Sequence, residues 1–144
     1  MSDPQQLAEH VGRSMYERDA ASQALGMVLA SIGPGFARMT MTVRPDMLNG
    51  HHICHGGLIF TLADSTFAYA CNSHNRATVA SGCSIEFLKP GRPGDLLTAE
   101  GREQTLSGRN GIYDIHVTNG HGETIAMFRG KSMQLREPVI KEDA

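Results

Sequence analysis

A single apolar segment, from Gly56 to about Ser73, most constrains what this chain can fold into. It contains no proline, and its mainly apolar residues return at helical spacing and extend almost all the way round the helix. These residues are Leu58, Ile59, Leu62, Ala63, Thr66, Phe67, Ala68, Tyr69 and Ala70. A helix of this kind has to be covered on most of its sides. The sequence therefore predicts a long buried helix with another layer wrapped around it.

Strand-like segments on both sides of the helix can supply that layer. Before it, MVLAS and FARMTMTV flank a GPG turn, and the second of these segments has the alternation of a half-buried strand. After it come ATVASGCSIEFL, LLTAEGREQTL, GIYDIHVTN and ETIAMFRGKSMQL, separated by the turn-rich segments KPGRPGD, SGRN and NGHG. We expect the first two strands to pair and the last four to form an antiparallel meander.

The whole pattern predicts one α+β domain over residues 1–136. A chain of 144 residues can bury a sufficient core without disulfide or metal support. The expected fold is a curved antiparallel β-sheet wrapped around one long central α-helix. Residues 1–24 form an N-terminal helical segment, with Asp3 as its cap. Residues 137–144 are expected to be a flexible polar tail.

Charge and cysteine content limit the partners and the compartment. The formal net charge of -2 provides no basic surface for nucleic-acid phosphates, so nucleic-acid binding is disfavoured. No apolar run approaches the roughly 20 residues of a membrane span. The first residues contain no segment typical of a signal peptide, and the three cysteines, an odd number, favour free thiols. Together these features predict a cytoplasmic protein with no membrane and no nucleic-acid partner.

The stretch NGHHICHGG, just before the predicted helix, raises the question of a metal site. His51, His52, Cys54 and His55 are all potential ligands within five residues. Their spacing does not suit a closed zinc site, because almost no chain intervenes between them and the customary distant pair of ligands is missing. We therefore expect no metal, with some of these groups lining a loop and the others packed beneath it.

The glycine pair Gly56 and Gly57 stands at the start of the predicted helix. The first N–H groups of a helix have no partners within it and carry partial positive charge, so they can receive a polarised carbonyl oxygen. Glycine lets a ligand come close to that backbone. The alternative is that the pair only makes a tight junction between loop and helix.

Asp64 is the single acid in the apolar segment. A carboxylate there is costly to bury without a partner, so it has either a function or a local hydrogen bond, for which Ser65 and Thr61 are available. Asp64 follows Gly57 by seven positions (64 − 57), which places both on one face of the helix but roughly 10 Å apart along its axis. One small substrate cannot reach both residues of the same helix. Two copies of the helix packed antiparallel can bring them together.

The spacing therefore predicts a homodimer with two composite sites. Each site takes its backbone donor, Gly57, from one chain and its carboxylate, Asp64, from the other. This arrangement suits acyl transfer to water, because the amide stabilises the oxyanion. The carboxylate either attacks the carbonyl carbon or deprotonates a water that does, and the sequence leaves these two roles open.

These residues, in this order, resemble a known family. The segments MLNGH, CHGG, LADSTFAYACNS and FLKPGRPGD are similar to those of the hotdog-fold thioesterases, and within them to the acyl-CoA thioesterases of phenylacetate degradation. The resemblance extends over nearly the whole chain. It implies a hydrolase acting on an aryl- or arylacetyl-CoA thioester of the phenylacetyl-CoA type, with no cofactor besides the coenzyme A of the substrate. It also implies a homodimer whose dimers pair into a homotetramer.

The resemblance also assigns roles to individual residues. Asp64 corresponds to the family's catalytic acid, and Gly57 to the glycine whose amide holds the oxyanion. Asn49 is implied to position the nucleophilic water or the thioester, and His55 to support the loop around the carbonyl. Gly56 is implied to lie against the substrate.

Other substrate contacts have several candidates. Some relatives carry a further serine on the strand after the central helix, and here Ser81 and Ser84 both qualify. Lys89 and Arg92, in the KPGRPG turn, are candidates for holding the coenzyme A phosphates, although most single surface charges only face water. The large side chains nearest the motif, any of which could line an acyl pocket or belong to the core, are Phe60, Phe67, Tyr69 and Met47.

Two other functions are open at this point. A hotdog hydratase or dehydratase would act on the same thioesters but leave the thioester bond whole. A non-catalytic acyl-CoA-binding module would bind without turnover, although the intact Asp64 argues against it.

Overall fold

The apolar segment forms the central helix of the structure, a computed structural model that describes residues 3–142. This helix, α3, comprises Gly56–Asn72. The other helices are α1 (Pro4–Glu17), α2 (Ala20–Ala24) and the short 3-10 helix η1 (Pro45–Met47). The strands are β1 (Val28–Gly33), β2 (Phe36–Thr42), β3 (Thr78–Phe87), β4 (Leu96–Ser107), β5 (Asn110–Thr118) and β6 (Thr124–Gln134).

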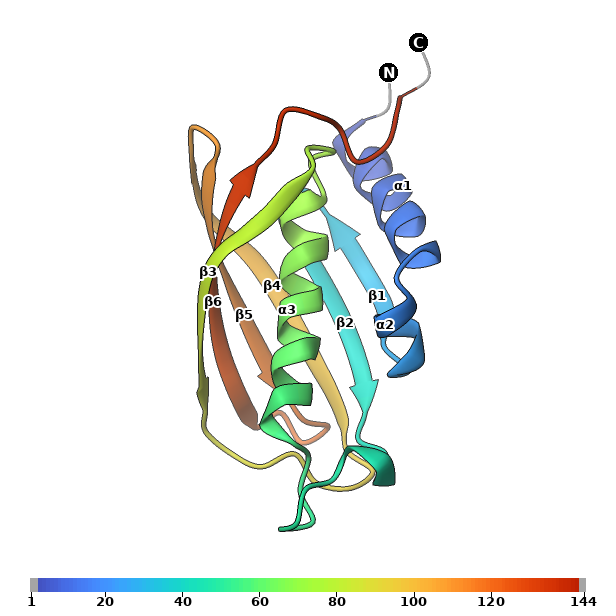
Figure 1. Cartoon of the computed structure of the whole chain (residues 1–144), viewed down its shortest axis with the longest axis vertical. Coiled ribbons are helices and arrows are strands. Elements are labelled where there is room, and N and C mark those ends of the chain that lie inside the picture. The colour runs from blue at the N-terminus through green and yellow to red at the C-terminus, as the bar shows by residue number, and fades with distance from the viewer. Residues whose placement is uncertain (1–2, 143–144) are drawn as a thin grey trace.

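These strands form one antiparallel sheet that curves around α3 (Figure 1). Their order in the sheet is β1-β2-β4-β5-β6-β3. Alternate side chains of each inner strand, such as Met39 and Met41 of β2, are fully buried, whereas Arg38 and Thr40 between them are not. The buried rows face α3, as the period of two along a strand requires. The predicted α+β class, with a sheet wrapped around a central helix, is confirmed.

The predicted meander of the last four strands is wrong for β3. This strand pairs with β6, while β4 pairs with β2 and β5. Residues 88–95 are therefore not a hairpin turn but a crossover past the start of α3 (Figure 1). Hydrogen bonds from Cys54 N–H to Gly91 O (2.8 Å) and from Gly94 N–H to Val43 O (2.9 Å) hold this crossover in place. The crossing lets the sheet cover α3 from both sides, which a local hairpin would not do.

One side of α3 remains uncovered within residues 3–142. Gly57 is exposed, and Thr61, Asp64 and Ala68 are partly exposed, at spacings of four, three and four residues that align them along the helix. On the opposite side, Thr66 and Ala70 are buried against β4, where a Cβ on Gly101 would lie 3.3 Å from Thr66 Cγ2 and 3.6 Å from Ala70 Cβ. The prediction of burial nearly all round the helix is therefore wrong for this stripe, because neither the sheet nor the N-terminal helices reach it.

The N-terminal helices cover one edge of the sheet. The predicted cap of α1 is confirmed, because the Asp3 carboxylate accepts an N–H of the first turn at 2.8 Å. The Tyr16 hydroxyl donates to the Met27 carbonyl, and Gln5 Nε2 donates to the Ile32 carbonyl at 2.8 Å. Side chains of α1 thus bond to a carbonyl group just before β1 and to one within it. The long strand at the other edge of the sheet is β3.

The last described residues pack on the chain rather than extending from it. The Asn75 side chain hydrogen-bonds to both the N–H and the carbonyl of Ile140, at 2.9 and 3.0 Å. The tail that was expected to be flexible is therefore tied down as far as Ile140, while 143–144 lie outside the described residues. None of the helices in the described part of the chain combines the length and the apolar character needed to cross a bilayer.

Candidate active site

The loop before α3 is organised by Asn49. Its Oδ1 accepts the N–H groups of His51 (2.9 Å) and Ile53 (3.3 Å), and its own N–H donates to the Ile53 carbonyl (2.8 Å). A side chain that hydrogen-bonds to the backbone two residues on is the usual way in which asparagine stabilises a tight turn. The Nδ2 group of Asn49 has no hydrogen-bond partner within residues 3–142 and stays available to a ligand.

His55 positions the first turn of α3 through its backbone. Its N–H donates to the Met47 carbonyl at 2.9 Å, and its carbonyl accepts the N–H groups of Leu58 (3.0 Å) and Ile59 (3.3 Å). The His55 ring is exposed and does not cap the helix. The N–H groups of Gly56 and Gly57, which lie between His55 and Leu58, have no acceptor among the described residues. They are the free donors that a helix N-terminus leaves for a ligand.

The surroundings of Gly56 require a glycine, whereas those of Gly57 within the protomer do not. A Cβ built on Gly56 would lie 3.2 Å from Cζ of Phe87, so a side chain there would press against that ring. A Cβ on Gly57 would meet no atom within 4 Å, and the φ of Gly57 is not in the left-handed region. Packing within the protomer therefore explains Gly56 but not Gly57. A junction role alone does not account for the second glycine, which favours close approach of a ligand or a partner chain.

Asp64 is partly exposed, and within residues 3–142 no hydrogen bond or ion pair involves its carboxylate. The neighbours that could have satisfied it bond elsewhere, since Thr61 Oγ1 donates to the Gly57 carbonyl (2.8 Å) and Ser65 Oγ lies 3.3 Å from Ser22 Oγ. Burial raises the pKa of Asp64 above the ordinary value of 3.8. A desolvated acid without a structural partner is typical of a functional site.

A cavity of about 370 Å³ opens beside the start of α3. Its lining includes three of the predicted site residues, Asn49, Gly56 and Lys89. Asp64 and Gly57 are not among the residues that line it. One protomer therefore brings the loop and the glycine pair to a cavity, but it does not bring the carboxylate there.

The two predicted phosphate-binding residues differ in their surroundings. Lys89 Nζ lies 2.5 Å from Glu123 Oε2, and this contact lowers the pKa of Glu123. Arg92 is exposed, and its guanidinium has no hydrogen-bond partner within residues 3–142. Its backbone N–H donates to Asp95 Oδ2 at 2.8 Å, which orders the turn. Arg92 is therefore the freer of the two cations.

The two candidate serines lie at different positions on β3. Ser84 lies opposite Arg129 of β6 in the sheet, and Arg129 lies opposite Asp114 of β5. The Arg129 and Asp114 side chains form an ion pair on the exposed face of the sheet, so Ser84 belongs to this exposed row. This row points away from α3. Ser81 lies at a bulge, where its Oγ donates to the Lys131 carbonyl at 3.2 Å. Of the two, only Ser84 is clearly on the side of the sheet opposite α3.

The large side chains expected near the motif are mostly core. Phe67, Tyr69 and Met47 are at most 1% exposed. Phe60 packs edge-on against Phe128, with ring centroids 5.4 Å apart. The rest of the cavity lining is Ile53, Cys54, Ile59, Phe87, Leu88 and Pro90. Of these, the sequence indicates Cys54 only as a potential metal ligand and Ile59 only as part of the apolar face of the helix. For Phe87, Leu88 and Pro90 the sequence signal is the segment FLKP after a strand, and the wrong prediction of a hairpin turn over residues 89–95 hides their proximity to α3.

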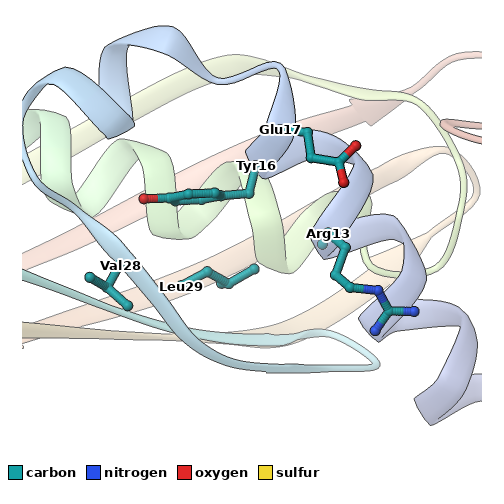
Figure 2. Close-up of a pocket in the computed structure, with 6 residues that line it drawn as sticks. Arg13, Tyr16, Glu17, Val28 and Leu29 are labelled. Carbon is teal, nitrogen blue, oxygen red and sulfur yellow. The ribbon is translucent and has the colours of Figure 1, made fainter.

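A second cavity, of about 320 Å³, lies between α1 and β1 (Figure 2). Tyr16, Val28 and Leu29 give it an apolar floor, and Arg13 and Glu17 stand at its rim with opposite charges. It contains none of the predicted site residues.

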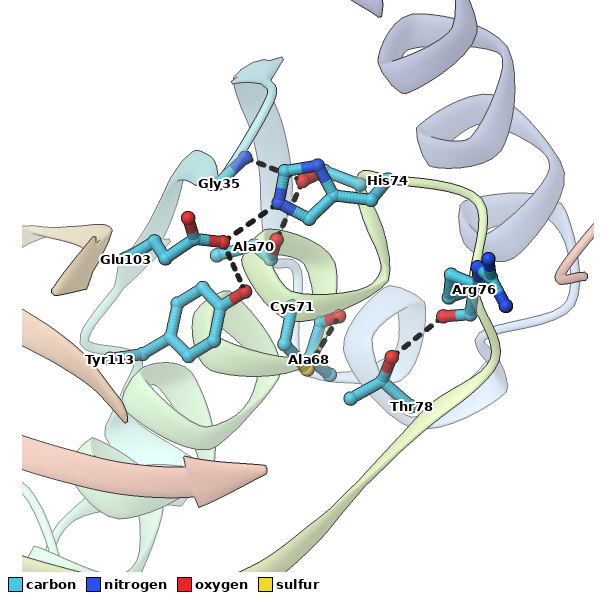
Figure 3. Close-up of polar contacts among 10 residues, drawn as sticks. Gly35, Ala68, Ala70, Cys71, His74, Arg76, Thr78, Glu103 and Tyr113 are labelled. Atoms are coloured by element: carbon cyan, nitrogen blue, oxygen red, sulfur yellow. Dashed lines mark hydrogen bonds and ion pairs between the residues drawn. The ribbon is translucent and has the colours of Figure 1, made fainter. Parts of the chain in front are cut away.

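A polar network ties the far end of α3 to the sheet (Figure 3). Glu103 Oε1 accepts the Tyr113 hydroxyl and lies beside His74 Nε2, both at 2.7 Å. Burial, together with this hydrogen bond, raises the pKa of the Tyr113 hydroxyl far above its usual range, so the hydroxyl remains a donor. Seventeen residues of helix separate the two ends of α3, so this network is distinct from the site at Gly56. Among residues 3–142, no group of three or more His, Cys, Asp or Glu side chains is arranged to hold a metal ion.

Comparisons with known proteins show the family of this chain. Residues 51–126 match the model of the thioesterase superfamily. The chain is 52% identical over 129 residues to the Escherichia coli (strain K12) protein named acyl-coenzyme A thioesterase PaaI, which covers 90% of this chain and 92% of that relative. The solved structure of the E. coli PaaI protein from the phenylacetic acid degradation operon is similar at a TM-score of 0.93 and 47% identity, over 94% of this chain and 99% of that one. A Streptococcus mutans protein solved bound to acetyl CoA is similar at a TM-score of 0.75 and 28% identity, over 78% and 90% of the two chains. The resemblance expected from the motifs is confirmed, and the chain belongs to the thioesterase superfamily.

Proposed function

We propose that this protein is an acyl-CoA thioesterase that hydrolyses an aryl- or arylacetyl-CoA ester to the free acid and coenzyme A. The observation that carries this proposal is a set of groups on α3 that have no hydrogen-bond partner within residues 3–142, namely the N–H groups of Gly56 and Gly57 and the partly desolvated carboxylate of Asp64. They supply an oxyanion donor and a base or nucleophile, which thioester hydrolysis requires. The relative named acyl-coenzyme A thioesterase supports the same substrate class.

In the proposed reaction, the thioester oxygen accepts the Gly57 N–H. Asp64 then takes a proton from water, whose oxygen bonds to the carbonyl carbon, or its own oxygen bonds to that carbon and water later opens the resulting anhydride. In both routes the C–S bond breaks and its electron pair leaves on sulfur as the coenzyme A thiolate, which then takes up a proton. The amide stabilises the negative oxygen of the tetrahedral stage, where charge is greatest.

Asn49 and His55 support this chemistry in different ways. Because Asn49 Oδ1 is already occupied by two backbone N–H groups, Nδ2 is the group that it offers to the substrate. It therefore donates to the thioester oxygen or to the attacking water, and it does not take the proton of that water. His55 acts through its backbone, which fixes where α3 begins.

We propose that the active unit is a homodimer formed through β3. This edge strand has ten residues, no proline and no lysine, and most of its side chains are exposed. Val79 on it is 48% exposed, and Met127 and Met133 of the neighbouring strand are 50% and 42% exposed. A long unprotected edge with apolar side chains favours pairing with another strand. Pairing with a second copy about a two-fold axis would set the two α3 helices antiparallel, as a site shared between Gly57 and Asp64 requires.

The resemblance to the family supports a homotetramer built from two such dimers. We also place the protein in the cytoplasm, since Cys54, Cys71 and Cys83 are free thiols, which favour a reducing compartment.

Measuring thiol release from a panel of acyl-CoA esters tests the proposed function. We expect release from phenylacetyl-CoA or another aryl ester, with equal amounts of free acid. If the thioester survives but its acyl chain gains or loses water, the protein is a hydratase or dehydratase. If the esters bind without any change, it is a binding module, and the proposal is wrong.

A further inference from the structure

We infer that the acyl group of the substrate occupies the cavity beside Gly56, and that the Phe87 ring selects which acyl groups fit. This inference rests on the proposed thioesterase function and adds the residue that sets its specificity. Phe87 is the last residue of β3, and residues 88–95 cross from it past the start of α3. That crossover brings the ring to the helix N-terminus.

Phe87 is placed where an aromatic substrate group would contact it. Its Cζ, Cε1 and Cε2 atoms lie 3.2, 3.4 and 3.6 Å from the position of a Cβ on Gly56. The missing side chain of Gly56 is therefore what lets the ring lie against the helix start. Phe87 is 50% exposed, and its ring forms no aromatic pair with the described residues. Part of its surface is thus free to contact a ligand.

The cavity has the size and lining that an aryl group needs. Its volume is about 370 Å³, whereas an apolar cavity of about 150 Å³ already accommodates a benzene ring. Besides Phe87, its apolar wall comes from Ile53, Cys54, Ile59 and other neighbours. Burial raises the pKa of the Cys54 thiol, so this group stays neutral and presents an apolar surface.

The lining favours the acyl group over the pantetheine arm of coenzyme A. That arm carries two amide groups, and each loses free energy when it is buried without a hydrogen-bond partner. The only polar side chains of the lining are Asn49 and Lys89, and Lys89 is already bonded to Glu123. An aryl group needs no such partners. With the carbonyl oxygen at the glycine N–H groups, the acyl side points into the cavity and the sulfur side points outward.

The Phe87→Ala variant tests this assignment. Removing the ring should lower kcat/KM for phenylacetyl-CoA by about tenfold, in line with the loss of an aromatic contact. It should change kcat/KM for acetyl-CoA by less than about threefold, because the acetyl group is too small to reach the ring. Leu106→Ala, at another exposed apolar residue far along β4, is the matched control and should alter neither value.

A second variant fills the cavity instead of enlarging it. Ile53 lies in the loop and is half-buried, so Ile53→Phe adds volume without disturbing the core. This variant should exclude aryl esters and spare acetyl-CoA, so that the preference between the two falls by about tenfold.

The outcomes separate this inference from the proposed function. If the unmodified protein releases no thiol from any ester, the proposed function fails. If it is active but both variants change all esters equally, the cavity holds the common coenzyme A part and this inference is wrong. Light scattering on each variant completes the test, because a Phe87→Ala protein that turns monomeric and loses all activity would show that the ring serves the subunit contact instead.

Discussion

Gly57 and Asp64 lie on the same open stripe of α3, and neither the N–H of the first nor the carboxylate of the second is hydrogen-bonded within residues 3–142. The helix holds them seven positions apart, which is roughly 10 Å along its axis. Both residues are at least partly exposed, so both groups are open to a substrate or to a partner chain.

Replacing Asp64 by asparagine should reduce kcat by at least about a hundredfold, the usual size of a positioned acid–base or nucleophilic contribution. The folded protein should be no less stable than the unmodified one at pH 7, because the carboxylate bonds to no group of the described chain and its charge is penalised by burial. Thiol release and thermal unfolding measured on the same preparation check both halves. Near-normal turnover would rule out Asp64 as the catalytic acid.

Activity should depend on pH through Asp64. Desolvation raises its pKa above 3.8 in the folded protein, and the group has to be ionised to act as base or nucleophile. The acid limb of kcat should therefore have its midpoint above the ordinary aspartate value, with activity lost as pH falls through it. The free energy of unfolding should depend on pH in the direction opposite to that of an ion-paired acid. Because the pKa of Asp64 is raised in the folded protein, stability falls as the group ionises with rising pH. An acid limb at or below 3.8 would contradict the assignment.

Gly57 permits a test of its backbone N–H. Gly57→Pro removes the N–H, which has no acceptor in the described chain, at a first-turn position where helices tolerate proline. Gly57→Ala keeps the N–H, and its Cβ meets nothing within 4 Å in the protomer. We expect kcat to fall by about a hundredfold or more in the proline variant and to fall much less in the alanine variant. Equal losses in the two would point to steric exclusion rather than a missing donor.

Mixing Gly57→Pro subunits with Asp64→Ala subunits tests whether the site is shared. If each site takes one group from each chain, a mixed dimer contains one site with both groups intact. Activity should then rise above that of either variant once subunit exchange is confirmed. No recovery in exchanged dimers would mean that each chain uses its own pair.

A charge at the middle of β3 should disrupt the dimer. Gly82 lies near the centre of the strand, where a two-fold axis would pass, and a Cβ there meets nothing within 4 Å. Gly82→Lys should leave the protomer folded but place two like charges together, so that mass by light scattering falls and thiol release is lost. Gly120→Lys, in the turn between β5 and β6, has equal space and should change neither. A fully active dimer with Gly82→Lys would exclude pairing through this edge.

The network at the other end of α3 should serve stability alone. Tyr113→Phe removes the hydroxyl that donates to Glu103 at 2.7 Å and leaves the packing of a fully buried ring unchanged. The free energy of unfolding should fall by about 1.5–3 kcal/mol, the usual net value of a hydrogen bond to a carboxylate, with kcat unchanged. Denaturant titration and thiol release provide the two readings. A variant with full stability but reduced turnover would instead link this network to the active site.

Much of the fold and of the candidate site follows from local sequence patterns. The helical spacing within residues 56–73 predicts α3, and the alternation in residues 36–43 predicts the buried row of β2. The seven-residue interval between Gly57 and Asp64 places them on one face. These predictions succeed because helix and strand periods are properties of the backbone and need no distant partner.

Other features depended on the tertiary structure. The turn-rich segment 89–95 does not reveal that β3 lies beside β6, since a strand's partner is decided by which apolar faces together cover α3. That placement carries Phe87 to the helix start, a contact between distant residues that no local period encodes. Two polar contacts also depended on the tertiary structure. Asn49 Oδ1 accepts N–H groups of its own loop, and Lys89 pairs with Glu123. A polar group bonds to whichever partner the folded chain brings within reach, so the sequence alone does not reveal these partners.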